Sequence, residues 1–126
     1  MSAVYDAGAL IAAERGDRAL WADHRARLEQ SDVPVVPAPV IAQVSRSARQ
    51  VQLRRLLRGC EVAALSEQRA HEAGFLLGKA GETDVTDAVV TVEAIARRAD
   101  IVTSDPGDIG ALLGAARGRL RIITVS

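Results

Sequence analysis

The chain has 126 residues, the length of one domain, and 48% of them are hydrophobic, which is enough for a single core. Its 16 basic and 16 acidic residues give a net charge of zero, which excludes the overall basic field of many nucleic-acid binders, so any such contact has to be local. One tryptophan, one tyrosine, one phenylalanine and one cysteine argue against a base-stacking surface and exclude an intramolecular disulfide and a multi-cysteine zinc site.

The N-terminal segment lacks the basic residues of a signal peptide, and Asp6 interrupts its first apolar run. No apolar stretch reaches the length that spans a membrane. We therefore expect a single cytoplasmic domain over residues 1–126.

Short β-branched runs alternate with helix-forming runs along the chain. Strands are expected at residues 3–5, 33–37, 61–65, 101–103 and 121–125. Helices are expected at residues 7–13, 17–30, from 39 to about 46, 50–57, from 67 to about 78, 84–99 and 107–116. This alternation predicts a parallel sheet with helices on both faces.

Residues that favour helix ends support these boundaries. Pro39 suits the first turn of a helix, because its missing N–H costs nothing there. Ser66 is a good N-cap, and Asp84 suits the same role for the central helix. Asp87 then falls in the first turn of that helix, and Gly59 is a plausible helix end.

Carboxylates stand where several of the expected elements begin or end. Asp6 follows the first strand, Asp105 follows the fourth, and Asp87 lies at the start of the central helix. Asp84 and Asp108 lie three residues from Asp87 and Asp105 respectively. Ligands of parallel sheets bind outside the carboxyl ends of the strands, so this pattern predicts one acidic pocket.

Such a pocket suits a hard divalent cation. Mg²⁺ and Mn²⁺ prefer oxygen ligands, and crowded carboxylates repel one another unless a cation offsets their charge. The cation can orient water, lower its pKa and stabilise charge on a phosphoryl oxygen. The chemistry that these residues favour is therefore metal-assisted hydrolysis of a phosphodiester.

Each carboxylate also has an ordinary structural explanation. Asp6 and Asp84 suit helix N-caps, and a carboxylate at Asp87 is stabilised by the helix dipole. Asp105 suits a turn before a proline, and Asp108 suits the opening of the last helix. The set as a whole, more than any one member, indicates a metal site.

Other polar residues have simpler interpretations. Five arginines without an acidic residue among them lie between positions 46 and 58, a strip that fits either a solvated helical face or an RNA backbone. His24 and His71 fall in charged helical surroundings, so both are predicted to lie at the surface. Cys60 is predicted to be a small buried residue.

With Val4-Tyr5-Asp6-Ala7 near the start, Asp87-Ala88 opening the central helix and Val102-Thr103-Ser104-Asp105 after it, the chain resembles the PIN-domain family. More narrowly, it resembles the VapC-like toxin ribonucleases of bacterial toxin–antitoxin systems. The resemblance implies a three-layer α/β/α fold with a five-stranded parallel sheet. It also implies Mg²⁺- or Mn²⁺-dependent cleavage of RNA, a small antitoxin partner and a homodimer.

By the same resemblance, Asp6, Asp87 and Asp105 hold the metal. The family's remaining acidic position, usually Glu, falls on Gln43, whose amide oxygen can bind a cation but brings no charge. Three outcomes stay open: weaker metal binding by about an order of magnitude, replacement of the charge by Asp84 or Asp108, or a domain that binds an antitoxin or RNA without cutting.

A phosphoacceptor receiver domain has a similar length and also keeps acidic residues at strand ends. Its site needs a lysine near the phosphoryl group. The one lysine, Lys79, falls at a glycine-flanked helix end and not after the last strand, which favours the nuclease.

Overall fold

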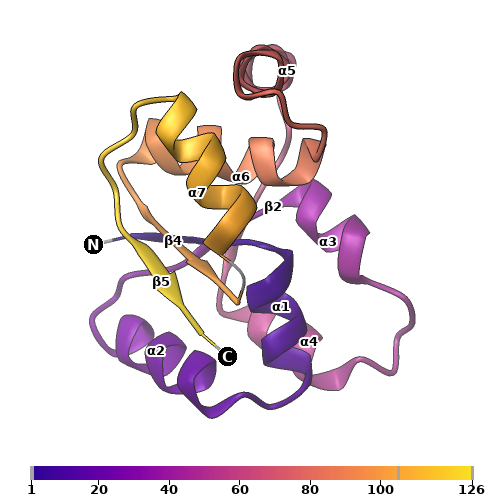
Figure 1. The fold of residues 1–126 in the computed structure, drawn as a ribbon. Helices are drawn as coiled ribbons and strands as arrows, with labels where there is room; N and C mark the ends of the chain where they lie inside the picture. Colours follow the sequence, from indigo (N-terminus) through magenta and orange to yellow (C-terminus); the bar gives the residue numbers. More distant parts are fainter. Residues whose placement is uncertain (1, 105, 126) are drawn as a thin grey trace.

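The structure, a computed structural model, describes residues 2–104 and 106–125. Over these residues the chain forms five strands and seven helices in alternation (Figure 1). The strands are β1 (Ala3–Tyr5), β2 (Val35–Pro37), β3 (Glu61–Ala63), β4 (Asp100–Thr103) and β5 (Ile122–Thr124). The helices are α1 (Ala7–Glu14), α2 (Arg18–Glu29), α3 (Ala38–Val44), α4 (Val51–Arg58), α5 (Glu67–Ala80), α6 (Val85–Arg97) and α7 (Pro106–Ala115).

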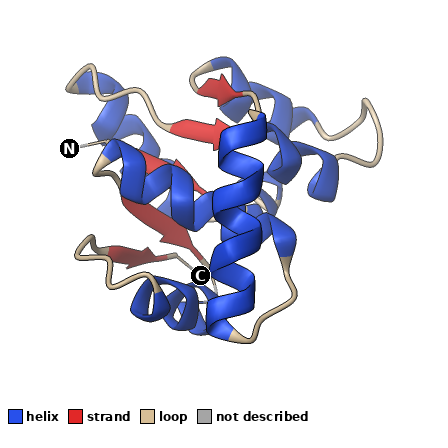
Figure 2. Ribbon diagram, turned by 90° about the horizontal axis from the view of Figure 1, so that it is seen from above, coloured by secondary structure: helices blue, strands red, loops and turns tan. Residues whose placement is uncertain are grey.

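The strands form one sheet in the order β3-β2-β1-β4-β5, and every neighbouring pair is parallel. From β1 the chain winds outward to β3 and then crosses back to β4 and β5. Because crossover connections between parallel strands are right-handed, this reversal places helices on both faces. Figures 1 and 2 show α5, α6 and α7 on one side of the sheet and α1, α2 and α4 on the other.

The predicted three-layer fold is therefore confirmed, with small corrections at the strand ends. β2 begins at Val35 and not at residue 33, and β3 ends at Ala63 and not at residue 65. The pairing of Val35–Pro37 with Glu61–Ala63 explains both limits, since neither strand has a partner beyond it. Val33 and Leu65 accordingly lie exposed outside the sheet.

Side-chain caps begin several helices, as the sequence predicted. Ser66 Oγ accepts a hydrogen bond from the amide of Arg69, and Asp84 Oδ1 accepts one from the amide of Asp87. The start of α4 has no such local cap. Glu14, at the end of α1, supplies it from a distance, because its Oε2 accepts a hydrogen bond from Leu53 N at 2.8 Å.

The prediction that His24 lies at the surface is wrong. Its side chain is buried, and its Nδ1 shares a 2.9 Å hydrogen bond with the hydroxyl of Tyr5 in the central strand. Burial lowers the pKa of His24 below its ordinary value. His71, in contrast, is exposed as predicted and pairs with Glu67.

Cys60 is half-buried, and burial raises its pKa to about 12, which fits a structural residue more than a reactive thiol. Its sulfur donates a hydrogen bond to the carbonyl oxygen of Leu56. None of the helices in the described part of the chain has the length and apolar character needed to cross a bilayer.

Candidate active site

Asp6 occupies the carboxyl end of the central strand, β1. The residue is only 4% exposed, and its Oδ1 accepts a hydrogen bond from Ala9 N at 2.9 Å, so Asp6 caps α1. Its own amide donates to the carbonyl oxygen of Val102 in β4 at 3.3 Å. These bonds fix the carboxylate at the edge where β1 and β4 end together.

Thr103 and Ser104 continue β4 beside Asp6. Thr103 is fully buried, and Ser104 is half-buried. A Cβ added at Gly8 would overlap Ser104 Oγ and lie 3.3 Å from Asp6 Oδ1. The Ser104 hydroxyl and the Asp6 carboxylate therefore approach the same point above Gly8.

Asp87 lies in the first turn of α6, as predicted. Asp84 caps this helix, since its Oδ1 accepts the hydrogen bond from the amide of Asp87 at 3.0 Å. The helix packs against β1 and β4 and also contacts α3. The structure thus brings the element that carries Asp87 against the strand that ends at Asp6.

The other predicted residues are Asp105, Asp108 and Gln43. Asp105 lies outside the described residues. Asp108 is exposed in the first turn of α7, where the prediction that it opens the last helix is confirmed. Gln43 is exposed near the end of α3, a helix that packs against α1 and α6.

Residues 2–104 and 106–125 contain no group of three or more His, Cys, Asp or Glu side chains placed to hold a metal ion. Asp6 and Asp87 nevertheless suit Mg²⁺, which is often held by one or two carboxylates and several waters. Both are hard oxygen donors delivered by elements in contact. The chemistry of the donors therefore fits a hard divalent cation.

Gly8 lies at the candidate site, although no pattern in the sequence singled it out. It lies two residues after Asp6, in the first turn of α1, and any larger side chain would meet Ser104. The only hint in the sequence is that this glycine follows a strand-end carboxylate by two residues, at the start of a helix. Only the structure shows that β4 approaches this residue closely.

The sequence matches no known family model and no curated protein. The fold, however, is similar to solved structures over nearly the whole chain. VapBC2 from Rickettsia felis, solved bound to a DNA fragment from its promoter, matches with a TM-score of 0.71 and 17% identity over 98% of each chain. PAE2754 from Pyrobaculum aerophilum matches with a TM-score of 0.62 and 19% identity over 96% of this chain and 89% of that one. Together with the five-stranded parallel sheet, these matches show that the chain has the three-layer PIN-like fold that its sequence predicted.

Proposed function

We propose that this protein is the toxin of a toxin–antitoxin pair and that it hydrolyses RNA phosphodiester bonds with the help of Mg²⁺ or Mn²⁺. The observation that carries this proposal is the position of Asp6. It lies buried directly after the central strand β1, where its amide is bonded to the end of β4, and β1 packs against α6, the helix that carries Asp87. Ligands bind at this edge of a parallel sheet, and carboxylates there suit a divalent cation that promotes hydrolysis of a phosphodiester.

Each residue of the candidate site has a proposed role in this reaction. Asp6 and Asp87 would hold the cation together with Asp105, which the family resemblance adds to the set, and Gln43 would assist from α3. When bound, the cation supplies Lewis acidity toward the phosphoryl oxygen and an activated water. The amide of Ala9 fixes the rotamer of Asp6, so the carboxylate is oriented before any ligand arrives. Ser104 places a hydroxyl beside this carboxylate, within reach of a water or a phosphate oxygen.

The toxin assignment predicts a protein partner. The structurally similar VapBC2 is, by its name, a two-component assembly, and it was solved on promoter DNA. For this chain we propose a small antitoxin that blocks the acidic pocket, with an arginine as the natural counter-charge for its carboxylates. We also propose a homodimer in the cytoplasm.

Gln43 favours a second candidate function. A neutral amide at this position lowers the negative charge available to a cation, and the side chain is exposed on α3. On this alternative the domain binds an antitoxin or RNA without cutting. Metal binding separates the two candidates.

Titration calorimetry with Mg²⁺ and Mn²⁺, with RNA cleavage assayed in parallel, tests the proposal. The nuclease predicts metal-dependent cleavage that is lost in Asp6→Ala and in Asp87→Ala. Antitoxin or RNA binding with no metal binding and no cleavage would establish the inactive module instead.

A further inference from the structure

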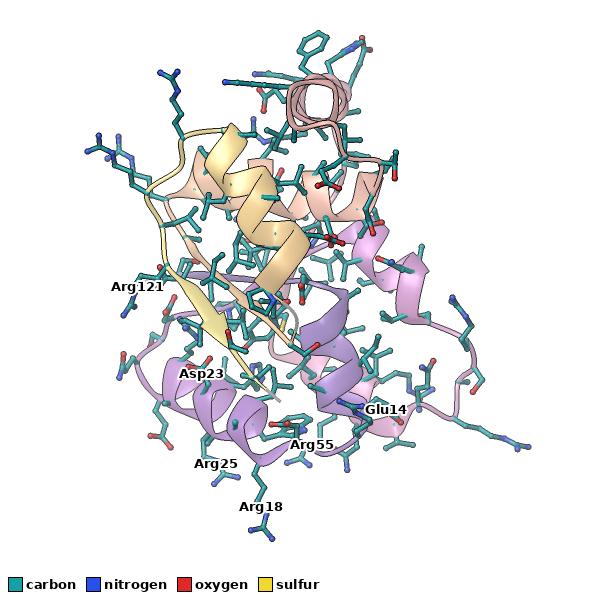
Figure 3. All side chains as sticks on the ribbon, in the orientation of Figure 1. Glu14, Arg18, Asp23, Arg25, Arg55 and Arg121 are labelled. Atoms are coloured by element: carbon teal, nitrogen blue, oxygen red, sulfur yellow. The ribbon has the colours of Figure 1, made fainter. Side chains whose placement is uncertain are left out.

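A basic pocket lies between α2 and α4, on the opposite side of the sheet from α6. It has a volume of about 370 Å³, and six residues define it here: Arg18, Trp21, Ala22, Arg25, Gln52 and Arg55. Figure 3 shows Arg18, Arg25 and Arg55 gathered on this side of the molecule. Among residues 2–104 and 106–125, no acidic side chain lines the pocket.

Helical spacing explains why these residues share one surface. Arg18, Trp21, Ala22 and Arg25 stand at positions i, i+3, i+4 and i+7 of α2, which form one face of a helix. Gln52 and Arg55 are three residues apart on α4 and face them. Ala22 leaves space in the middle of this face, because its side chain is only a methyl group.

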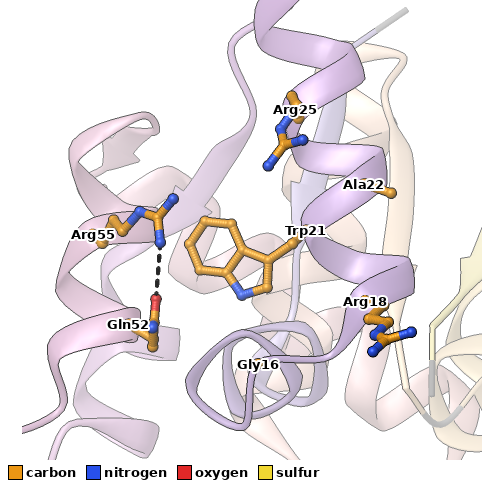
Figure 4. Close-up of a pocket in the computed structure, with 7 residues that line it drawn as sticks. All are labelled: Gly16, Arg18, Trp21, Ala22, Arg25, Gln52 and Arg55. Atoms are coloured by element: carbon orange, nitrogen blue, oxygen red, sulfur yellow. Dashed lines mark hydrogen bonds between the residues drawn. The ribbon is translucent and has the colours of Figure 1, made fainter.

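The indole of Trp21 is held in place between the arginines. Its Nε1 donates a hydrogen bond to the carbonyl oxygen of Ala13 at 3.0 Å, and its ring stands perpendicular to that of His24, with the centroids 5.7 Å apart. The guanidinium of Arg55 lies 4.9 Å from the ring centroid and also bonds Gln52 Oε1. Figure 4 shows the indole flanked by Arg25 and Arg55. The pocket therefore offers a fixed aromatic ring with cationic groups around it.

The charge of this pocket is not neutralised within the described part of the chain. Arg18, Arg25 and Arg55 have no carboxylate partner within ion-pair distance there. Two acidic residues close to these arginines in the sequence have other partners: Asp17 caps α2, and Asp23 pairs with Arg27 at 2.7 Å. An adjoining cavity of about 380 Å³ adds one acidic residue, Glu29, beyond Arg25. The pocket thus suits an anion that also has a flat face.

We propose that this basic pocket binds one nucleotide of the RNA substrate, a few nucleotides away from the bond that is cut. Phosphate oxygens would contact the guanidinium groups, and the base would pack against Trp21. Arginine and aromatic rings are the groups on which single-stranded bases stack without sequence preference. The choice of RNA as the anion rests on the proposed function.

The geometry of α1 links this pocket to the candidate active site. Asp6 caps the start of α1, and Gly16, just beyond its end, borders the pocket. Eight residues of helix span about 12 Å, a distance that a few nucleotides of single strand cover. The exposed Arg54 and Arg58 extend the cationic surface along α4. A strand of RNA is favoured over an acidic protein segment because the pocket pairs its cationic groups with the flat indole of Trp21, which suits a phosphate joined to a base.

Trp21 is the single tryptophan of the chain, so its fluorescence reports on this pocket directly. The protein is titrated with hexauridylate in EDTA, with excitation where uridine absorbs little, and with hexaglutamate in a second arm. The proposal predicts a saturable change in Trp21 emission with the RNA. Arg18→Gln and Arg25→Gln should weaken binding by about three- to tenfold and reduce its salt dependence by about one phosphate contact.

Two further variants sharpen the test. Ala22→Leu fills the pocket without changing its charge and should weaken RNA binding, whereas Arg119→Gln, which removes an exposed arginine elsewhere, should not. The proposal is overturned if labelled RNA binds while Trp21 emission and the Arg18, Arg25 and Ala22 variants show no effect. It is also overturned if hexaglutamate changes the emission and RNA does not.

These outcomes are independent of the proposed nuclease activity, because EDTA prevents any metal-dependent cleavage during the titration. Cleavage is measured separately with Mn²⁺ present, in the wild type and in Asp87→Asn. A change in Trp21 emission with RNA, but no cleavage, would support the RNA-binding pocket and contradict the proposed nuclease activity. Cleavage without any change in Trp21 emission would support the nuclease activity and contradict the RNA-binding pocket.

Discussion

The amide of Asp6 donates a hydrogen bond to the carbonyl oxygen of Val102 at 3.3 Å, which ties the end of β1 to the end of β4. The same residue caps α1 through the amide of Ala9. Asp6 therefore connects the end of β1, the end of β4 and the start of α1 through its hydrogen bonds. A carboxylate held in this way costs little further entropy when it binds a ligand.

We predict that Asp6→Asn and Asp87→Asn abolish RNA cleavage and weaken Mn²⁺ binding by at least about 10- to 100-fold. Asparagine keeps the shape of aspartate and is an equally good N-cap, so Asp6→Asn retains the hydrogen bond to Ala9. Calorimetry measures the affinity, and urea unfolding checks that stability is preserved. Asp17→Asn, which changes a capping residue of α2 in the same way, is the matched control and should leave metal binding intact.

Gln43→Glu should tighten Mn²⁺ binding by about an order of magnitude and raise any nuclease activity, because it adds a charge where the resemblance places a ligand. Gln68→Glu, an equally exposed change on α5, controls for the general effect of one negative charge. Equal affinities in Gln43→Glu and wild type would show that position 43 is not a ligand.

Gly8→Ala should lower activity without unfolding the protein. Alanine favours the helix by about 1 kcal/mol over glycine, but its Cβ would displace the Ser104 hydroxyl and approach the Asp6 carboxylate. Removing that hydroxyl in the Gly8→Ala/Ser104→Ala double variant relieves the overlap with Oγ and leaves the tighter-than-usual 3.1 Å approach to the backbone nitrogen of residue 104. Cleavage rates of the wild type, the two single variants and the double variant form a double-mutant cycle. Additive effects in this cycle would show that Gly8 and Ser104 are not coupled.

The order of strands and helices could be predicted from the sequence because each element is bounded by local signals. Asp6, Ser66 and Asp84 are caps whose role follows from their own residue type and position. The metal-binding role of Asp6 and Asp87 stays a prediction. Whether side chains from distant segments meet is set by packing, and a sequence records that only indirectly.

Long-range polar contacts account for what the sequence did not show. His24 stands among charged neighbours, which suggested a surface position, yet it lies one turn after Leu20 on the buried face of α2. Its partner, Tyr5, is 19 residues away in the chain. The cap that Glu14 gives to Leu53 spans 39 residues. No local pattern predicts either contact.

The buried His24 makes stability depend on pH. Burial lowers its pKa in the folded state, so below the ordinary value of 6.5 the unfolded chain takes up a proton that the folded protein does not. Neutral His24 therefore contributes its full share of the free energy of unfolding above pH 6.5, and this share is lost as the pH falls toward the folded-state pKa. The slope for one proton is at most about 1.4 kcal/mol per pH unit.

Urea unfolding across this pH range measures the effect. His24→Asn keeps an acceptor near the Tyr5 hydroxyl and removes the titrating group, so its stability should vary less with pH than that of the wild type. The exposed His71→Asn should retain the wild-type pH dependence. Identical pH profiles for wild type and His24→Asn would contradict the assignment.

The most direct measurement of the central claim is the anomalous scattering of Mn²⁺ in crystals of this protein. We predict one peak at the edge where β1 and β4 end, within about 2.0–2.4 Å of carboxylate oxygens from both Asp6 and Asp87. A well-ordered site in which these two carboxylates share no ion at saturating Mn²⁺ would contradict the account, whatever the fold resembles.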